Sequence, residues 1–284
     1  MIEAQPSKTA MRVAMRRAAH QIFDIPRVLD DPIALPIIGA EVAAKVEAER
    51  SKQEGRVART IRAFMAARSR FAEDELARSI GRGAMQYVIL GAGLDTFAYR
   101  NPFADSALRV FEVDFPATQE WKRRKLAAAG IPIPASVTYA PVDFEGRTLA
   151  EGLRLAGFDP AKPTFFSWLG VTMYLTEEAA MATLGFIGST PPGGGVVFDY
   201  AIPRSSLNLI GRLALDAMAA RVAALGEPFQ TYFEPKALAE RLRQMGFHSV
   251  EDLDSAAINE RYFKDRADGL RVMGGIGHLM CALL

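Results

Sequence analysis

The stretch QYVILGAGLDTFAYR, which runs from Gln86 to Arg100, changes character at Gly91. Its opening run, QYVIL, has the aliphatic and aromatic composition of a strand buried on both faces. Gly91 and Gly93 follow, and glycine lets a backbone turn tightly and approach a ligand without a clash at Cβ. Ligands of open α/β sheets bind beyond the carboxyl ends of the strands. The stretch therefore predicts a strand that ends in a ligand-binding turn, with an ordinary tight turn as the simpler alternative.

Further runs along the chain have the length and composition of strands. They cover residues 108–114, 136–142, 164–170, 195–200, 248–253 and 276–284. The first four, like 86–90, are nearly continuous apolar runs, which favours central parallel strands buried on both faces. The stretches ATQEWKRRKLAAAG (117–130) and TEEAAMATLGFIGS (176–189) are typical of helices. This alternation predicts an α/β fold with right-handed βαβ units and a mostly parallel, doubly wound sheet.

The part of the chain before this alternation has a different organisation. Helical patterns fill it, interrupted at VLDDPIALPIIG (28–39) by two prolines. We therefore expect a helical N-terminal cap over residues 1–80 and a core over residues 81–284. Within the core, the segment around 202–233 is predicted to be a helical insertion that acts as a lid.

Composition and charge exclude several classes of protein. Half of the 284 residues are hydrophobic and 24% are charged, which is ordinary for a globular chain with a large core. The 34 basic and 33 acidic residues give a net charge of +1, so no overall field favours nucleic acid or an anionic membrane. Cys281 is the only cysteine, and this excludes an internal disulfide. The N-terminus lacks the apolar segment of a secretory signal, and no apolar run has the length of a membrane span. We expect a soluble, cytoplasmic protein.

The end of the second predicted strand supports a nucleoside-containing ligand. The run FEVD places Asp114 21 residues after Gly93, where a carboxylate can accept hydrogen bonds from a ribose. A dinucleotide site usually has a third glycine, and Thr96 stands at that position here. The glycine pattern therefore argues against an NAD(P)-dependent oxidoreductase, which remains the alternative.

A loop after the third predicted strand carries a second acidic residue. The sequence PVDFE places Asp143 and Phe144 beyond the sheet. A carboxylate beside an aromatic ring can hold an adenine, by a hydrogen bond to its amino group and by ring contact. The same carboxylate could instead cap the following helix. The residues alone leave both interpretations open.

An arginine on an apolar helix face is a further candidate. Val57, Ile61, Phe64 and Arg68 are spaced by 4, 3 and 4 residues, which puts them on one stripe of a helix. A buried arginine needs an anionic partner, either a ligand carboxylate or an internal acid. The neighbouring arginines are expected to be solvated on other faces: Arg56, Arg59 and Arg62.

The stretch SWLGVTMYLTEEA (167–179) ends the fourth predicted strand and enters a helix, with Thr176 as the expected N-cap. Trp168 and Tyr174 either line a pocket there or belong to the core. The histidines are scattered along the sequence: His20 is a weak candidate for a general base, and His278 is expected to be structural. No cluster with the spacing of a metal site is visible, and we predict no metal.

Together these motifs resemble a known family. The matching stretches are DDPIA (30–34), ARSRFAED (67–74), YVILGAGLDTFAYR (87–100), FEVDFPATQEWKRRKL (111–126), VDFE (142–145) and SWLGVTMYL (167–175). They are similar to the leucine carboxyl methyltransferase-like family of S-adenosylmethionine-dependent O-methyltransferases. That family includes protein phosphatase carboxyl methylases and a bacterial branch with members that act on polyketides. The resemblance implies a Rossmann-like class I methyltransferase fold with a seven-stranded, mostly parallel sheet.

The resemblance also implies S-adenosyl-L-methionine as cofactor and a role for each matching residue. Arg68 matches the arginine that binds the methionine carboxylate, and Asp114 matches the acid on the ribose hydroxyls. The predicted cofactor-binding set is Arg68, Gly91, Ala92, Gly93, Asp114, Phe115, Asp143, Phe144 and Trp168. Asp95 is expected to hold the turn through backbone N–H groups or to pair with Arg100. One position departs from the pattern, because Leu169 stands where several family members have a glutamate that meets the methionine end.

The expected acceptor is a small, largely apolar molecule that is methylated on a carboxylate or hydroxyl oxygen. A carboxylate needs no general base at neutral pH, whereas a hydroxyl is helped by one, and the sequence assigns no catalytic residue. The predicted insertion is rich in apolar residues: Leu207, Ile210, Leu213, Leu215, Met218 and Phe229. Ordinary helix packing or a dimer face would explain these residues equally well. A non-catalytic member of the fold also remains open.

Overall fold

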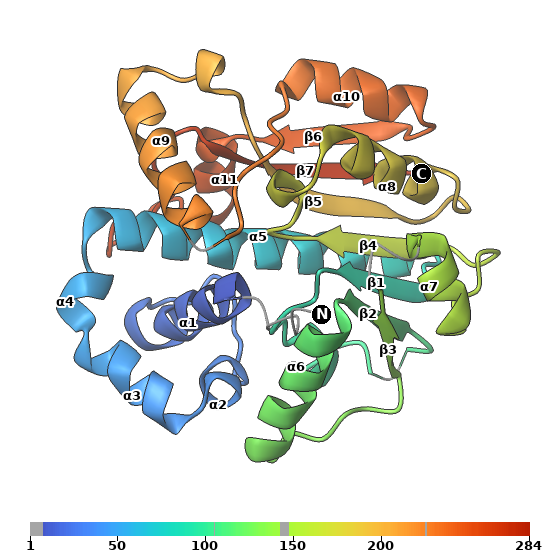
Figure 1. Ribbon diagram of the computed structural model, residues 1–284, viewed down its shortest axis with the longest axis horizontal. Coiled ribbons are helices and arrows are strands. Elements are labelled where there is room, and N and C mark those ends of the chain that lie inside the picture. Colours follow the sequence, from blue (N-terminus) through green and yellow to red (C-terminus); the bar gives the residue numbers. More distant parts are fainter. Residues whose placement is uncertain (1–7, 105, 143–147, 225) are drawn as a thin grey trace. The chain divides into compact units, whose positions relative to one another are not determined.

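The computed structural model describes residues 8–104, 106–142, 148–224 and 226–284 (Figure 1). Its strands are β1 (Gln86–Leu90), β2 (Arg109–Asp114), β3 (Val137–Pro141), β4 (Thr164–Trp168), β5 (Gly195–Ala201), β6 (Ser249–Leu253) and β7 (Gly277–Leu283). Its α-helices are α1 (Lys8–Phe23), α2 (Ala34–Ile38), α3 (Ala40–Ala48), α4 (Arg50–Gln53), α5 (Arg56–Gly81), α6 (Pro116–Ala128), α7 (Leu149–Leu155), α8 (Glu177–Gly188), α9 (Leu209–Ala223), α10 (Pro235–Gln244) and α11 (Ser255–Tyr262). Three short 3₁₀ turns lie at Phe97–Tyr99, Thr172–Tyr174 and Arg204–Ser206.

The strands form a sheet of order β3-β2-β1-β4-β5-β7-β6 within the described part of the chain. The pairs β2·β3, β1·β4 and β4·β5 are parallel, and β7 runs antiparallel to both β5 and β6. Every run predicted as a strand forms one, so the α/β fold with a mostly parallel sheet is confirmed. The expectation of burial on both faces is wrong for β3. That strand is at the edge of the sheet, and Val137, Thr138 and Tyr139 are only half-buried.

The chain divides into two compact units. The first comprises the described residues up to Arg70, Gly91–Phe158 and Asn259–Val272, and the second comprises Phe71–Leu90, Asp159–Ile258 and Met273–Leu284. Each unit joins segments that are far apart in the sequence, as expected for a fold in which sheet strands and their helices come from successive βαβ units.

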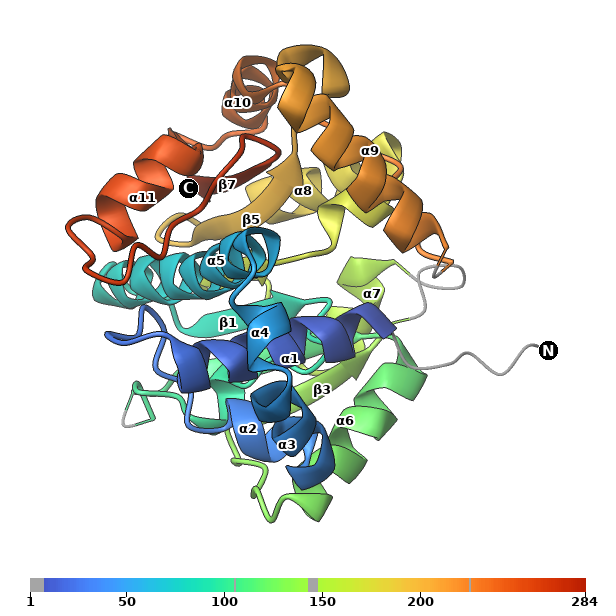
Figure 2. The same cartoon turned by 90° about the vertical axis from the view of Figure 1, so that its left-hand side faces the viewer.

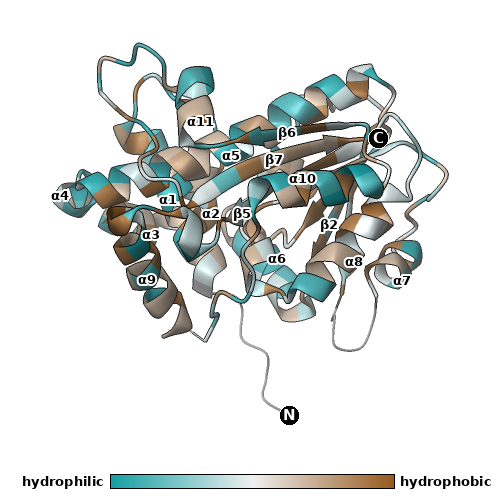
Figure 3. Ribbon diagram, turned by 90° about the horizontal axis from the view of Figure 1, so that it is seen from above, coloured by the Kyte–Doolittle hydropathy of each residue, from teal (hydrophilic) through white to brown (hydrophobic). Residues whose placement is uncertain are grey.

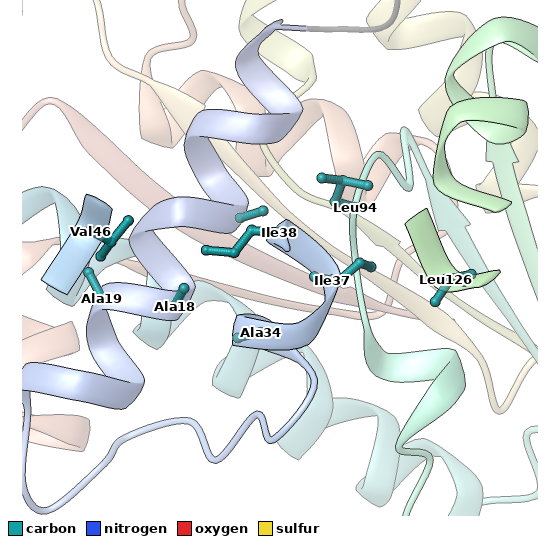
Figure 4. Close-up of a cluster of buried hydrophobic side chains, with 9 residues drawn as sticks. Ala18, Ala19, Ala34, Ile37, Ile38, Val46, Leu94 and Leu126 are labelled. Atoms are coloured by element: carbon teal, nitrogen blue, oxygen red, sulfur yellow. The ribbon is translucent and has the colours of Figure 1, made fainter. Parts of the chain in front are cut away.

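The first unit is built around α1, α2 and α3, which pack against one another (Figure 2). Their apolar faces form a cluster that also includes Leu94 and Leu126 (Figure 4). Its buried members are Ala14, Ala18, Ala19, Ala34, Ile37, Ile38, Val46, Leu94 and Leu126. The fully buried residues that α1 contributes to the cluster are alanines, and small side chains let helices approach closely. The cluster therefore joins the N-terminal helices to the residue after Gly93 and to α6.

The second unit contains β1, β4, β5, β7 and β6, with α10 alongside β6 (Figure 1). The helix α8 begins where the sequence predicts, because the Thr176 side chain accepts a hydrogen bond from the Ala179 N–H at 3.2 Å. Aromatic side chains fill one face of this part of the sheet, and the Trp168 and Phe198 rings lie 6.4 Å apart. Cys281 is a buried cysteine on β7.

Candidate cofactor-binding site

The turn that follows β1 has the backbone conformation that favours glycine. Gly91 has φ 66° and Gly93 has φ 45°, both in the left-handed region. The Ala92 N–H donates to the Val113 carbonyl at 3.0 Å, and the Gly93 N–H donates to Asp114 Oδ2 at 2.6 Å. The turn is therefore bound to the end of β2. The structure brings Ala92, Gly93 and Asp114 together, as the sequence predicts from strand ends that meet at one edge.

Asp114 has a defined hydrogen-bonding environment. Its Oδ1 accepts a hydrogen bond from the Phe115 N–H at 2.7 Å, while Oδ2 is bound to Gly93. Burial raises the pKa of Asp114 above its ordinary value, although the two backbone hydrogen bonds and the charge of Lys122 oppose the rise. A carboxylate offers about four lone-pair sites. The Thr118 side chain also bonds to this carboxylate, so about one site is left for a ligand hydroxyl while Asp114 holds the turn.

A buried charged group lies two residues before Asp114 on the same face of β2. Glu112 is fully buried, and its Oε2 lies 2.7 Å from Lys122 Nζ of α6. The Tyr99 hydroxyl donates to the same carboxylate at 3.1 Å and lies 2.6 Å from the Tyr139 hydroxyl. Burial raises the pKa of Tyr139 to about 12. Sequence reasoning missed this cluster, although a glutamate inside the apolar run RVFEV was a signal that a cation lies opposite.

Gly93 also faces the protein itself. An ideal Cβ at this position would lie 3.1 Å from the Ala10 Cβ of α1, which is tighter than ordinary van der Waals contact. Part of the requirement for glycine therefore comes from α1. Sequence reasoning assigned that requirement to the ligand or to a tight turn and missed α1, because nothing local links Ala10 to a residue so far along the chain.

Arg68 is buried on α5, with 5% of its surface exposed, as its position on the predicted stripe requires. The rest of the stripe differs from the prediction. Val57 is 68% exposed, and Arg62, expected to be solvated, is fully buried. The stripe predicted from spacing alone is therefore wrong for the first turns of α5. Arg62 is buried because it pairs with a buried acid, and the sequence around Arg62 gives no sign of that acid.

That acid is Asp24, at the end of α1. Arg62 binds both Asp24 oxygens, from Nε at 2.7 Å and from Nη2 at 2.8 Å, and its Nη1 donates to the Gln53 carbonyl at 2.7 Å. His20 Nδ1 lies 2.8 Å from Asp24 Oδ2. We refer to Arg62, Asp24, His20 and Gln53 as the Arg62 network.

The Arg62 network also decides the role of His20. Its Nε2 accepts hydrogen bonds from the Val28 N–H at 3.0 Å and the Leu29 N–H at 3.2 Å, so Nδ1 carries the proton that faces Asp24. Both ring nitrogens are occupied and the side chain is fully buried. His20 is a structural residue, and its candidacy as a general base is wrong.

Trp168, Asp143 and Phe144 are the predicted site residues that remain. Trp168 is 2% exposed at the end of β4 in the second unit, packed against Phe198. Asp143 and Phe144 lie outside the described residues. The N-cap of α7 is Thr148, whose hydroxyl accepts from the Glu151 N–H at 3.3 Å while the Glu151 carboxylate accepts from the Thr148 N–H at 3.0 Å.

Aromatic side chains gather on the loops that follow β4 and the α9 helix in the second unit. The Tyr174 and Phe229 rings lie 5.5 Å apart, and Phe229 meets Tyr232 edge-on at 6.4 Å. The two loops are joined because the Gln230 N–H donates to the Met173 carbonyl at 2.7 Å. All three rings are half-buried. We refer to Tyr174, Phe229 and Tyr232 as the aromatic group.

The helix α9 contains both hydrophobic and hydrophilic residues along its length (Figure 3). Leu209, Ile210 and Leu213 are 72%, 78% and 61% exposed, whereas Leu207 and Leu215 are buried. The apolar residues in and next to α9 therefore fall into two sets, one buried and one exposed. One set packs inward, and the other set is left on the surface.

The geometry of the turn fits an adenosyl group. Gly91 is exposed, Gly93 is half-buried, and the Asp114 carboxylate beside them has a lone pair left for a ligand hydroxyl. Within the described ranges, no group of three or more His, Cys, Asp or Glu side chains is arranged to hold a metal ion. In the same part of the chain, no helix is both long and apolar enough to cross a membrane.

Comparisons with known proteins agree with this geometry. Residues 10–188 match the family model described as leucine carboxyl methyltransferase. A Bacillus subtilis protein named "Putative S-adenosyl-L-methionine-dependent methyltransferase YktD" is 33% identical over 300 residues, covering 98% of each chain. A Saccharopolyspora erythraea protein, named in the same way apart from the suffix, is 33% identical over 201 residues, with 70% of this chain and 69% of the relative covered.

Solved structures share the fold. A Thermobifida fusca protein, named a "putative methyltransferase", aligns over 99% of this chain and 96% of its own with a TM-score of 0.56 at 14% identity. A DUF574 family protein of Streptomyces avermitilis aligns over 94% and 96% with a TM-score of 0.53 at 14% identity. The sheet is therefore that of class I methyltransferases. The chain belongs to the leucine carboxyl methyltransferase family, and it is an S-adenosylmethionine-dependent methyltransferase.

Proposed function

We propose that the protein transfers the methyl group to an oxygen atom of a small, largely apolar acceptor. The observation that carries this proposal is the surface of the second unit after β4 and β5. There the aromatic group and the exposed Leu209, Ile210 and Leu213 present apolar area. Exposed apolar patches of this kind mark binding sites more often than ordinary surface does.

The first unit would hold the cofactor. Asp114 would accept a hydrogen bond from a ribose hydroxyl, and the Gly91–Gly93 turn would support the nucleoside from below. Arg68 is proposed to bind the methionine carboxylate, and Asp143 with Phe144 to contact the adenine. Trp168 is the weakest member of the set, because it is buried against Phe198. Phe115, next to Asp114, is half-buried and can contact the nucleoside.

The chemistry asks little of the protein beyond alignment. When bound, S-adenosylmethionine supplies a methyl group that its positively charged sulfur makes electrophilic. The acceptor oxygen forms a bond to the methyl carbon as the carbon–sulfur bond breaks, and the bonding electron pair remains on sulfur. The protein would hold the acceptor oxygen, the methyl carbon and the sulfur in line and would keep water away from the acceptor.

The acceptor oxygen belongs to a carboxylate or to a hydroxyl. The family model's name refers to a leucine carboxyl group, which supports a carboxylate next to an apolar group. A carboxylate is already ionised at neutral pH and needs no base, whereas a hydroxyl loses a proton during the reaction. His20 cannot take that proton, because both of its ring nitrogens are bonded within the protein.

Methyl transfer to matched acceptors tests the proposal. We would incubate the protein with methyl-labelled S-adenosylmethionine and pairs of apolar carboxylic acids and phenols of equal size. A methyl ester releases methanol in mild base and an aryl methyl ether does not, so the product chemistry identifies the oxygen. Labelled nitrogen or carbon products, with none on oxygen, would refute the assignment.

A pair of leucine substitutions tests the acceptor surface. Leu213→Ser on α9 should raise KM for an apolar acceptor by about tenfold, the value of one well-buried aliphatic contact, with kcat unchanged. Leu155→Ser on α7 is the matched control, since Leu155 is 60% exposed and Leu213 is 61% exposed. The control should behave like the wild type. Equal KM values in the two variants would remove α9 from the acceptor site.

A further inference from the structure

The residues that follow Gly93 face the N-terminal helices. Leu94 belongs to the apolar cluster of α1, α2 and α3, together with Ile37 and Ile38 (Figure 4). Asp95 and Thr96 take part in a polar network with Arg17 of α1 and with Asp31 of the loop that precedes α2. The turn is therefore bound by one apolar and two polar residues in succession. These contacts lie outside the predicted cofactor-binding set.

The polar network is centred on Arg17 of α1, and its members are Arg17, Asp31, Asp95, Thr96 and Arg100. Arg17 Nε donates to Asp31 Oδ2 at 3.1 Å, and Nη2 bonds to both Asp31 and Thr96. The Thr96 hydroxyl donates to Asp31 Oδ2 at 2.8 Å and accepts from Arg100 Nε at 3.2 Å. We refer to these five residues as the Arg17 network.

Asp95 adds a second link from the turn to α1. Its Oδ1 accepts a hydrogen bond from the Phe97 N–H at 2.8 Å, which holds the turn as the sequence suggests. Its Oδ2 lies 3.6 Å from Arg17 Nη1. The Arg17 side chain also reaches the Leu94 carbonyl at 3.5 Å. Arg17 therefore contacts three consecutive residues of the turn.

The Arg17 network is buried and balanced in charge. Arg17 is 4% exposed, and Asp31 and Thr96 are fully buried. Two arginines face two aspartates, so no charge is left uncompensated, which a buried site requires. Burial would raise the pKa of Asp31, but the charges of Arg17 and Arg100 outweigh it and hold that pKa below its ordinary value. Such networks fix one arrangement, because a partly satisfied alternative is costly.

The turn that this network holds carries the N–H that binds Asp114. Gly93 precedes Leu94, and its N–H donates to Asp114 Oδ2 at 2.6 Å. We propose that Arg17, Asp31 and Thr96 are positioning residues for the cofactor: they fix the Gly91–Gly93 turn against α1 so that the Gly93 N–H and the Asp114 carboxylate are already in place. The proposal rests on the cofactor site proposed above. It explains why the motifs DDPIA and GAGLDT occur together in one sequence.

Thr96→Val tests this role. Valine has the shape of threonine and lacks the hydroxyl, so Asp31 loses a donor while the packing is kept. We expect the Kd for S-adenosylhomocysteine, measured by isothermal titration, to rise about tenfold, as for one hydrogen bond to a charged group. Thr96→Ser restores the hydroxyl and should bind within about twofold of the wild type. This rescue separates the hydrogen bond from general damage to the fold.

The Arg62 network provides the matched control. It is equally buried and also involves α1, but within the described chain Arg62 and Asp24 bond to His20, Gln53 and Glu54 and not to the turn. Asp24→Asn should lower the Tm by as much as Thr96→Val and leave the Kd unchanged. The two variants thus have similar losses of stability and different losses of affinity.

The possible outcomes separate the two proposals. A wild-type protein that binds S-adenosylhomocysteine while Thr96→Val keeps the same Kd would overturn the positioning role alone. A wild-type protein that does not bind it would remove the cofactor site and the positioning role with it. Should Thr96→Val fail to fold, Asp95→Asn takes its place at a side chain that is 23% exposed. A Kd unchanged by Asp95→Asn would then count against the proposal, and a rise of about threefold or more would support it.

Discussion

At the scale of single residues, Asp114 makes the sharpest prediction, because its charge is used twice. Its carboxylate holds the Gly93 N–H and is proposed to accept a hydrogen bond from a ribose hydroxyl, and both uses need the ionised form. Burial raises the pKa of Asp114 above the ordinary value of about 3.9. The affinity for S-adenosylhomocysteine should therefore be highest above the raised pKa. It should decline as the pH falls through that value, by up to about tenfold per pH unit.

Isothermal titration between about pH 4.5 and 8 at constant ionic strength measures this decline. Asp114→Asn should bind more weakly at neutral pH and lose the decline, because an amide does not titrate in this range. Burial raises the pKa of the nearby Glu112 as well, and the asparagine variant distinguishes the two carboxyls. Asp24 and Asp31 stay ionised, because their cationic partners outweigh the effect of burial and hold each pKa below its ordinary value. A wild-type profile in the variant would assign the titration to another group.

At the scale of elements, the turn before β5 shows how closely the strands approach. The segment PPGGG (191–195) connects α8 to β5. An ideal Cβ at Gly194 would lie 1.9 Å from the Thr164 carbonyl oxygen and 2.7 Å from its carbonyl carbon. Both are backbone atoms of the neighbouring strand β4, so they cannot move aside without breaking the β4·β5 pairing. Gly194→Ala should therefore destabilise the protein by about 3 kcal/mol, the upper end of the range for overpacked sites.

Gly185 is the control for this prediction. It lies inside α8, and an ideal Cβ there meets nothing within 4 Å. Gly185→Ala should stabilise the protein by about 0.5–1 kcal/mol, since alanine is the better helix former. Denaturant midpoints followed by tryptophan fluorescence compare the two variants. Equal midpoints would mean that the backbone around Gly194 moves away from the Thr164 carbonyl with little loss of stability.

The elements also show what can be predicted from sequence. A strand that is buried on both faces has a nearly continuous apolar sequence. The position and burial of β1, β4 and β5 were therefore predictable from local composition. The partial exposure of β3 was not predictable, because an apolar run of the same kind can also form an edge strand. Only the strand order shows that β3 is at the edge of the sheet. Helical spacing placed Arg68 correctly and failed for Arg62, whose burial depends on Asp24, 38 residues away in the sequence.

The candidate site divides in the same way. The proximity of Gly91, Gly93 and Asp114 was predictable, because parallel strands end at the same edge of the sheet and each of the two strand ends is recognisable in the sequence. The Arg17 network has no such signal. Arg17 and Thr96 are 79 residues apart, and each alone reads as a surface residue of a helix or a turn. Only the packing of α1 and α2 against Leu94 brings them together.

At the scale of the whole molecule, ligand binding should stabilise the fold. A ligand that binds only the native state at 100 times its Kd adds about 2.7 kcal/mol to the free energy of unfolding. For a chain of 284 residues this corresponds to a rise in Tm of about 4–5 °C. S-adenosylhomocysteine should produce that rise, and NAD(P) should produce none, because Thr96 occupies the place of the third glycine and the relatives are named for a different cofactor.

Two variants test whether the thermal shift depends on the proposed cofactor site. Asp114→Ala should show a much smaller shift at the same ligand concentration, since it lacks the carboxylate that is proposed to meet the ribose. Gly185→Ala should melt slightly higher without ligand and keep the full shift, because it changes a helix and no part of the site. A full shift in Asp114→Ala would show that the nucleoside is held elsewhere. The proposed roles of the Gly91–Gly93 turn and of the Arg17 network would then be lost, while membership of the family would stand.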